Sequence, residues 1–119
     1  MADILVAIDA IETYVAEGSL SKGLIYDACR VRLIEIGEAV KNIDPNVLAA
    51  IPSIRWRAIS RMRDRLAHHY FDTDHALVEY VVNEELAPLR AAVVALADIA
   101  DGFRNISARD KPPTPEVDT

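Results

Sequence analysis

The stretch "SIRWRAISRMRDRLAHHY", residues 53–70, combines an apolar stripe with a row of arginines in a single segment. Ile59, Met62 and Leu66 recur at spacings of three and four, which places them on one face of an α-helix with Ala58 beside them. The opposite face carries arginines at i, i+4 and i+8, namely Arg57, Arg61 and Arg65. The stretch is therefore predicted to be a helix that packs by its apolar stripe against other helices.

Three helices are predicted before this stretch and one after it. Apolar residues recur at helical spacing almost throughout the chain, and no segment shows the sustained period-two alternation of a β-strand. The helices before the stretch are predicted over about residues 2–17, over about residues 21–41, and as a short element that begins at Pro45. The predicted fold class is all-α, an up-and-down four-helix bundle with a short extra helix.

The last helix is predicted to begin after an N-cap in "FDTD", at one of residues 72–74, and to reach about residue 101. Pro88 is expected to kink or divide this helix, because proline has no amide hydrogen to donate. Gly102 is expected to end it.

The composition indicates one soluble domain. The 119 residues are 51% hydrophobic and 27% charged, and no apolar run approaches the roughly 18 residues of a membrane helix. The first residues are acidic where a secretory signal would be basic, and the single cysteine, Cys29, is expected to be buried and inert. We predict a cytoplasmic protein without membrane partners, with a helical domain over residues 1–103 and a proline-rich flexible tail over residues 104–119.

Charge is segregated along the chain. The net charge is -6, yet residues 54–70 carry +4, so the remainder carries -10. An acidic chain repels nucleic acid on average, but phosphate affinity comes from local clusters of cations. The arginine-rich helix is therefore the candidate site for an anionic partner.

The two histidines of this helix fall on different faces. His68 falls among the outward arginines, whereas His69 falls beside Met62 and Leu66, where a hydrogen-bonded core histidine is expected. His68 is accordingly the candidate catalytic histidine.

Trp56, Arg63 and Tyr70 are spaced seven apart and form a third stripe on the flank of the core, where the rings are expected to support the guanidinium. On a regular helix, Arg63 and His68 point about 140° apart. They could converge if Arg63 reaches around the helix or if the helix loosens before Tyr70. We favour a third arrangement, in which a second copy of the chain supplies the missing half across a two-fold axis.

Arginine and histidine together suit metal-free cleavage of RNA. Arginine is a permanent forked donor for phosphate oxygens, and histidine can transfer protons near neutral pH. Asp64 lies four residues before His68, so its carboxylate is expected to accept a hydrogen bond from the imidazole and to set its tautomer. From periodicity alone, a solvated basic face explains the pattern equally well.

Other charged groups have simpler explanations. Arg57, Arg61 and Arg65 could grip RNA phosphates, or they could form a solvated face with ion pairs to the helix that bears Glu35 and Glu38. Asp72, Asp74 and His75 suggest a metal only weakly, because helix capping explains the acids. No metal and no cofactor are predicted.

Four segments resemble the HEPN-domain family, specifically the HepT-like toxins of HEPN/MNT toxin–antitoxin modules. "RDRLAHHY" fits the R-x4-H-x-Y signature. The other matching segments are "EIGEAVKNI", "IPSIRWRAISRM" and "YFDTDHALVEYVVNEELAPLRA", so that the resemblance covers roughly residues 4–97. It implies a HEPN helical bundle, commonly a homodimer with the active site where two motif helices meet.

The resemblance also implies a metal-independent endoribonuclease with Arg63 and His68 as the catalytic pair. Asp64 occupies the variable polar position, where asparagine is more usual. Tyr70 matches a tyrosine that, in some members, a cognate MNT-type nucleotidyltransferase antitoxin modifies with AMP. The expected partners are RNA, a second copy of the chain and that antitoxin, with no DNA. The alternative is a non-catalytic nucleotide-binding or regulatory subunit of the nucleotidyltransferase.

Overall fold

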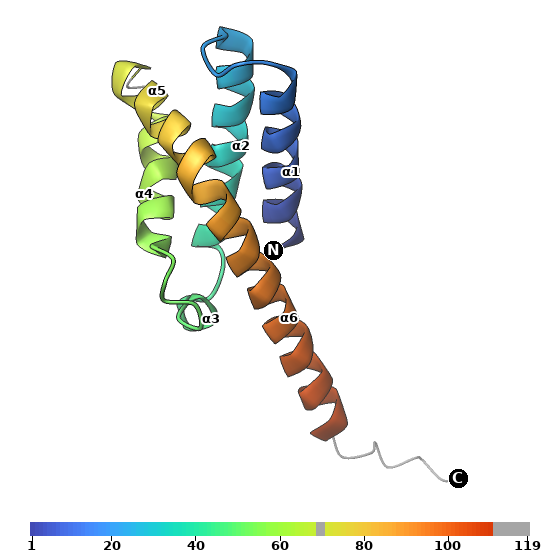
Figure 1. Ribbon diagram of the computed structural model, residues 1–119. Coiled ribbons are helices and arrows are strands. Elements are labelled where there is room, and N and C mark those ends of the chain that lie inside the picture. Colours follow the sequence, from blue (N-terminus) through green and yellow to red (C-terminus); the bar gives the residue numbers. More distant parts are fainter. Residues whose placement is uncertain (69–70, 111–119) are drawn as a thin grey trace, which may run out of the picture.

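The computed structural model describes residues 1–68 and 71–110, with side chains described for residues 1–68 and 74–101. Helices are the only regular secondary structure in this part of the chain, and turns connect them (Figure 1). The elements in chain order are α1 Ala2–Glu17, α2 Gly23–Lys41, α3 Pro45–Leu48, α4 Trp56–Ala67, α5 Phe71–Tyr80, the π-helical segment η1 Val81–Glu85, and α6 Leu86–Asp110. The all-α prediction is confirmed.

The first three helices lie where the sequence predicts them. α1 has the predicted bounds, and α2 begins two residues later than expected. α3 begins with Pro45 at its first turn, and the Asp44 carboxylate caps it by accepting a hydrogen bond from the Asn46 amide at 2.9 Å. Proline suits this position because its missing N–H would have no helical partner there.

α4 is shorter than predicted at both ends. It begins at Trp56, because the residues before it form a turn in which the Trp56 indole N–H donates to the Ile51 carbonyl at 3.0 Å. It ends at Ala67, and His68 is the C-cap residue. The predicted apolar stripe is confirmed, since Ile59, Met62 and Leu66 are buried. Ala58, which was expected beside the stripe, is exposed.

The last helical region corrects two predictions. α5 already begins at Phe71, so Asp72, Thr73 and Asp74 lie inside the helix and the predicted N-cap among them was wrong. α6 continues through Gly102 to Asp110. Glycine inside a helix costs about 1 kcal/mol relative to alanine, which is too little to end a long helix. The tail boundary at residue 104 stays a prediction, and residues 111–119 lie outside the described part.

Pro88 does not divide the helical region. The chain runs from α5 through η1 into α6, and the wider π-helical turn over Val81–Glu85 contains the residue four positions before the proline. Proline cannot donate to the carbonyl four residues earlier, and its ring crowds that carbonyl. A π-helical turn is one way in which a helix accommodates such a defect without breaking.

α2 is the central element of the bundle. It packs against α1 on one side and α4 on the other, while the long helix formed by α5, η1 and α6 crosses the bundle (Figure 1). The C-terminal part of α6 extends beyond the other helices. The largest fully buried apolar side chains of the core are Ile4, Ile8, Ile11, Leu33, Ile36, Val40, Leu66, Val78, Val93 and Leu96. Within the described residues, no helix combines the length and apolar character needed to cross a membrane.

Candidate active site

A glycine sets how closely α2 and α4 approach. A Cβ atom added at Gly37 would lie 2.3 Å from Arg63 Cβ and 3.2 Å from the Ile59 carbonyl oxygen. Both distances are shorter than ordinary van der Waals contact. The absence of a side chain at Gly37 therefore lets the two helices meet at the position of Arg63. Gly37 was not among the site residues predicted from the sequence, although a glycine in the middle of a helical pattern often marks a close approach.

Arg63 lies against α2 and contacts two carboxylates. Its Nε atom is 2.7 Å from Glu38 Oε2, in an ion pair without the angles of a hydrogen bond. Its Nη1 atom donates to Asp64 Oδ1 at 3.2 Å. The side chain remains 32% exposed. A guanidinium has five N–H donors, so these contacts leave others that can bind a phosphate oxygen.

Asp64 is shared by two cations. Its Oδ1 atom accepts hydrogen bonds from Arg63 and from Lys41, which lies in the last turn of α2. The bond from Lys41, followed by that from Arg63, holds the pKa of the Asp64 carboxyl below its ordinary value. Asp64 is therefore a carboxylate at neutral pH, and the positive charges of Lys41 and Arg63 neutralise it.

His68 is exposed, as predicted, but its partner differs from the predicted one. Its Nδ1 atom lies 2.7 Å from the Asp64 main-chain carbonyl, and not against the Asp64 carboxylate. A carbonyl oxygen can only accept, so Nδ1 carries the hydrogen. In the neutral imidazole, Nε2 is then the unprotonated nitrogen. The tautomer of His68 is thus defined, as predicted, but by the main-chain carbonyl of Asp64 in place of its carboxylate.

Arg63 and His68 are joined through one residue. Arg63 contacts the Asp64 side chain and His68 contacts its carbonyl, and in the described part of the chain no hydrogen bond joins the two directly. This agrees with their predicted divergence on the helix. The expected support of Arg63 by Trp56 is not found among the described side chains, while His69 and Tyr70 lie outside the described residues.

The three arginines on the outward face of α4 differ in whether they form ion pairs with other described residues. Arg57 and Arg61 are exposed, and neither has an ion pair with another described residue. Arg65 pairs with Asp74, with its Nε atom 3.5 Å from Asp74 Oδ1. The anticipated pairs with Glu35 and Glu38 of α2 are therefore not formed by this stripe.

Asp74 is a buried carboxylate that the sequence did not reveal as such. Its side chain is 1% exposed, and the pair with Arg65 joins the end of α4 to the first turn of α5. His75 stacks on Tyr26, with ring centroids 5.0 Å apart and planes 13° apart. No group of three metal-ligating side chains occurs among the described residues, and the weak metal suggestion at Asp72, Asp74 and His75 includes Asp72, whose side chain lies outside them.

A side chain of α2 also contacts the C-terminal end of α4. Arg30 Nη2 donates to the Leu66 carbonyl at 2.5 Å, which satisfies a main-chain acceptor that the helix end leaves open. The hydrogen bond from Arg30 to Leu66 and the ion pair between Arg65 and Asp74 thus fix the end of α4 next to His68.

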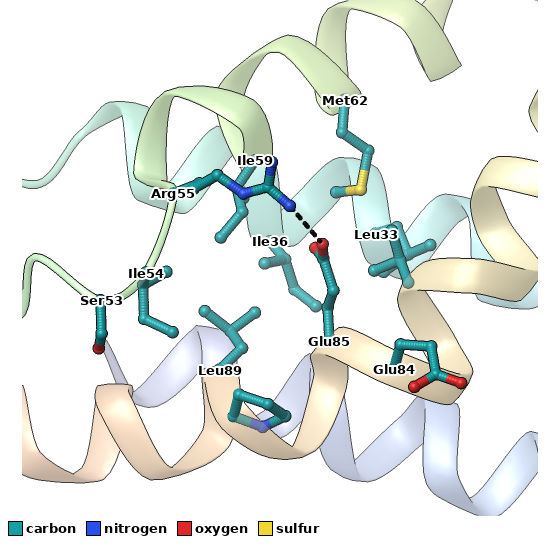
Figure 2. Close-up of a pocket in the computed structure, with 12 residues that line it drawn as sticks. Leu33, Ile36, Ser53, Ile54, Arg55, Ile59, Met62, Glu84, Glu85 and Leu89 are labelled. Carbon is teal, nitrogen blue, oxygen red and sulfur yellow. Dashed lines mark ion pairs between the residues drawn. The ribbon is translucent and has the colours of Figure 1, made fainter.

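A separate cavity of about 160 Å³ lies near the other end of α4 (Figure 2). Its walls are mainly apolar and include Ile36, Ile59 and Leu89, and Arg55 pairs with Glu85 at 3.9 Å beside it. Pockets for drug-sized ligands measure roughly 300–1,000 Å³, so this cavity is small for a nucleotide. The exposed cluster around Arg63, Asp64 and His68 is the stronger candidate.

The fold is an all-α bundle consistent with the HEPN type, and it carries an arginine, an acid and a histidine at the end of one helix. The model of the HepT-like family, described as ribonuclease HepT-like, matches residues 4–96. This chain belongs to that family of ribonucleases.

Two relatives show the extent of the similarity. A Thermococcus cleftensis protein named as a probable ribonuclease HepT is 35% identical over 94 residues, which cover 76% of this chain and 86% of the relative. A Methanocaldococcus jannaschii protein named as a candidate RNase is 38% identical over 56 residues, covering 45% of this chain and 46% of the relative. No solved structure matches this chain with significance.

Proposed function

We propose that the chain is a metal-independent endoribonuclease that cleaves RNA by transesterification at Arg63 and His68. The observation that carries this proposal is the link of both side chains to Asp64 at the exposed end of α4. That link holds a permanent cation and a titratable imidazole near each other at the C-terminal end of α4. These are the two groups that metal-free phosphodiester cleavage requires.

In the proposed reaction, His68 Nε2 takes the proton of the 2′-hydroxyl. The 2′-oxygen then attacks phosphorus, the bond to the 5′-oxygen breaks, and that oxygen takes a proton from water, while His68 returns the proton it had taken to the solvent. Arg63 stabilises the added charge on the phosphoryl oxygens. The products are a 2′,3′-cyclic phosphate and a 5′-hydroxyl end. Proton transfer by one histidine contributes typically 10² to 10⁴ in rate.

The test is cleavage of a labelled RNA in excess chelator by the wild type, His68→Ala and His75→Gln. We expect cyclic-phosphate products from the wild type and a loss of at least 100-fold for His68→Ala. His75 stacks on Tyr26 and contacts the Leu20 carbonyl and Glu79, with no hydrogen bond or ion pair to the cluster, so His75→Gln serves as the matched control. Equal rates for the wild type and His68→Ala would refute the catalytic assignment.

We further propose a homodimer in which Arg63 of one subunit acts with His68 of the other. The two side chains contact different atoms of Asp64, and in the described part of the chain no hydrogen bond joins them, which favours this arrangement. Mixing equal amounts of Arg63→Ala and His68→Ala subunits should restore about a quarter of the activity, because half of the dimers then hold one intact site. No restoration, or a monomer that cleaves RNA, would refute the shared site.

The proposed biological role is that of a cytoplasmic toxin of a type II HEPN/MNT module. Arg57 and Arg61, which are exposed, could hold flanking phosphates of the RNA. A cognate nucleotidyltransferase would silence the toxin by attaching AMP to Tyr70. Mass spectrometry after incubation with ATP and that partner tests this step. A mass shift that persists in Tyr70→Phe would refute the target residue.

The alternative is a non-catalytic subunit that binds nucleotides or regulates the nucleotidyltransferase. It predicts equal growth arrest and equal RNA decay on expression of the wild type and of His68→Ala, and the ribonuclease proposal predicts a difference.

A further inference from the structure

Lys41 lies at the site although it is 22 residues away from Arg63 along the chain. The close approach at Gly37 brings the last turn of α2 against α4. Lys41 Nζ and Arg63 Nη1 then donate to the same oxygen atom, Asp64 Oδ1. Two cations are thus held side by side, and the Lys41 side chain is 33% exposed.

The charges of this cluster cancel in the free protein. Arg63 and Lys41 contribute two positive charges, and Asp64 and Glu38 contribute two negative charges. Without Lys41 the cluster would be net negative and would repel a phosphate. An ammonium group has three N–H donors, so its bond to Asp64 leaves two for a phosphate oxygen.

We propose that Lys41 is a second phosphate-binding residue of the site, which Asp64 holds beside Arg63 for an RNA phosphate. This inference rests on the proposed ribonuclease function and adds a substrate contact to it. The shared oxygen places both cations where they can reach oxygens of one phosphate or of two neighbouring phosphates. Asp64, in place of a neutral side chain, would then serve to position the lysine.

The simpler alternative is that Lys41 only neutralises Asp64 and the C-terminal end of α2. The two roles differ once Asp64 is replaced by a neutral side chain. If Lys41 only neutralises the carboxylate, its removal has no effect on RNA binding in an Asp64→Asn background. If Lys41 binds phosphate, its removal weakens RNA binding in both backgrounds, because the amide oxygen introduced by Asp64→Asn can still accept a hydrogen bond from the lysine.

The test measures RNA affinity by fluorescence anisotropy at several salt concentrations, with His68→Ala in every protein so that the RNA stays intact. We expect Lys41→Gln to weaken RNA binding about tenfold, with and without Asp64→Asn. The salt slope, which is the slope of the logarithm of the binding constant against the logarithm of the salt concentration, should fall in magnitude by about one. Lys41→Arg should restore the slope. Lys22, an exposed lysine at the N-cap of α2, supplies the control Lys22→Gln.

Three outcomes would be informative. Loss of affinity and slope in both backgrounds supports the inference. A slope equal to that of Lys22→Gln, or an effect that disappears with Asp64→Asn, overturns it, while cleavage by the wild type would leave the ribonuclease proposal intact. If the wild type binds RNA in the predicted way but never cleaves it, the ribonuclease proposal fails and the phosphate contact stands.

Discussion

The close approach of α2 and α4 at Gly37 can be tested by adding a single methyl group. In Gly37→Ala the new Cβ would lie 2.3 Å from Arg63 Cβ, 3.0 Å from Arg63 Cγ and 3.2 Å from the Ile59 carbonyl oxygen. Favourable contacts between carbon atoms occur at about 3.5–4.0 Å. Arg63 Cβ and the Ile59 carbonyl are attached to the α4 backbone, so no rotation of a side chain relieves the clash.

The helices must therefore separate locally by about 1 Å. A radial gap of 0.5–1 Å forfeits about a quarter to a half of the dispersion energy of the affected contacts, and overpacking of this kind costs about 1–3 kcal/mol or more. Against this, alanine gains about 1 kcal/mol over glycine inside a helix. We expect a net loss of about 1–2 kcal/mol in the free energy of unfolding, because the clash involves backbone-anchored atoms. RNA cleavage should fall as well, since the separation pulls Lys41 away from Asp64.

Urea denaturation of Gly37→Ala and Gly23→Ala provides the measurement. A Cβ at Gly23, the first residue of α2, meets nothing within 4 Å. Gly23→Ala should therefore leave the unfolding midpoint unchanged or raise it. Equal midpoints and equal cleavage rates for the two variants would refute the argument that Gly37 is needed for the site.

Two further predictions concern carboxylates that form ion pairs with residues of α4 or α2. The pKa of Asp64 is lowered chiefly by Lys41, so their pairing stabilises the fold above about pH 4 and this contribution is lost as the pH falls through the lowered pKa. Urea midpoints of the wild type and Asp64→Asn should differ at pH 7 and converge in acid, and a constant difference would contradict the pairing. Asp74→Ala should lower the free energy of unfolding by about 2 kcal/mol. This is less than the roughly 3–5 kcal/mol lost when a fully buried ion pair is broken, because Arg65 is 42% exposed. Asp98→Ala, at an exposed position on α6, should stay within about 0.5 kcal/mol of the wild type, and an equal effect of both changes would refute the role of Asp74.

The sequence was sufficient for the features that depend on periodicity. Apolar residues at helical spacing gave the helices and the buried stripe of Ile59, Met62 and Leu66, and the same geometry placed His68 on the outside. These features are local, because the direction of a side chain on a helix depends only on its position along that helix. The helix ends were less accessible, since Asp74 lies inside a helix that tertiary packing stabilises, and a single glycine such as Gly102 costs too little to end a long helix.

Only the tertiary structure decided which groups the motif residues contact. The sequence suggested that Asp64 would bind the imidazole of His68, but its carboxylate binds Lys41 and Arg63 while its carbonyl binds His68. Lys41 comes from another helix, and its distance from Asp64 depends on how closely two helix axes approach. That approach is set by the missing side chain of Gly37 against α4, a contact between distant residues that no periodic pattern within one helix encodes.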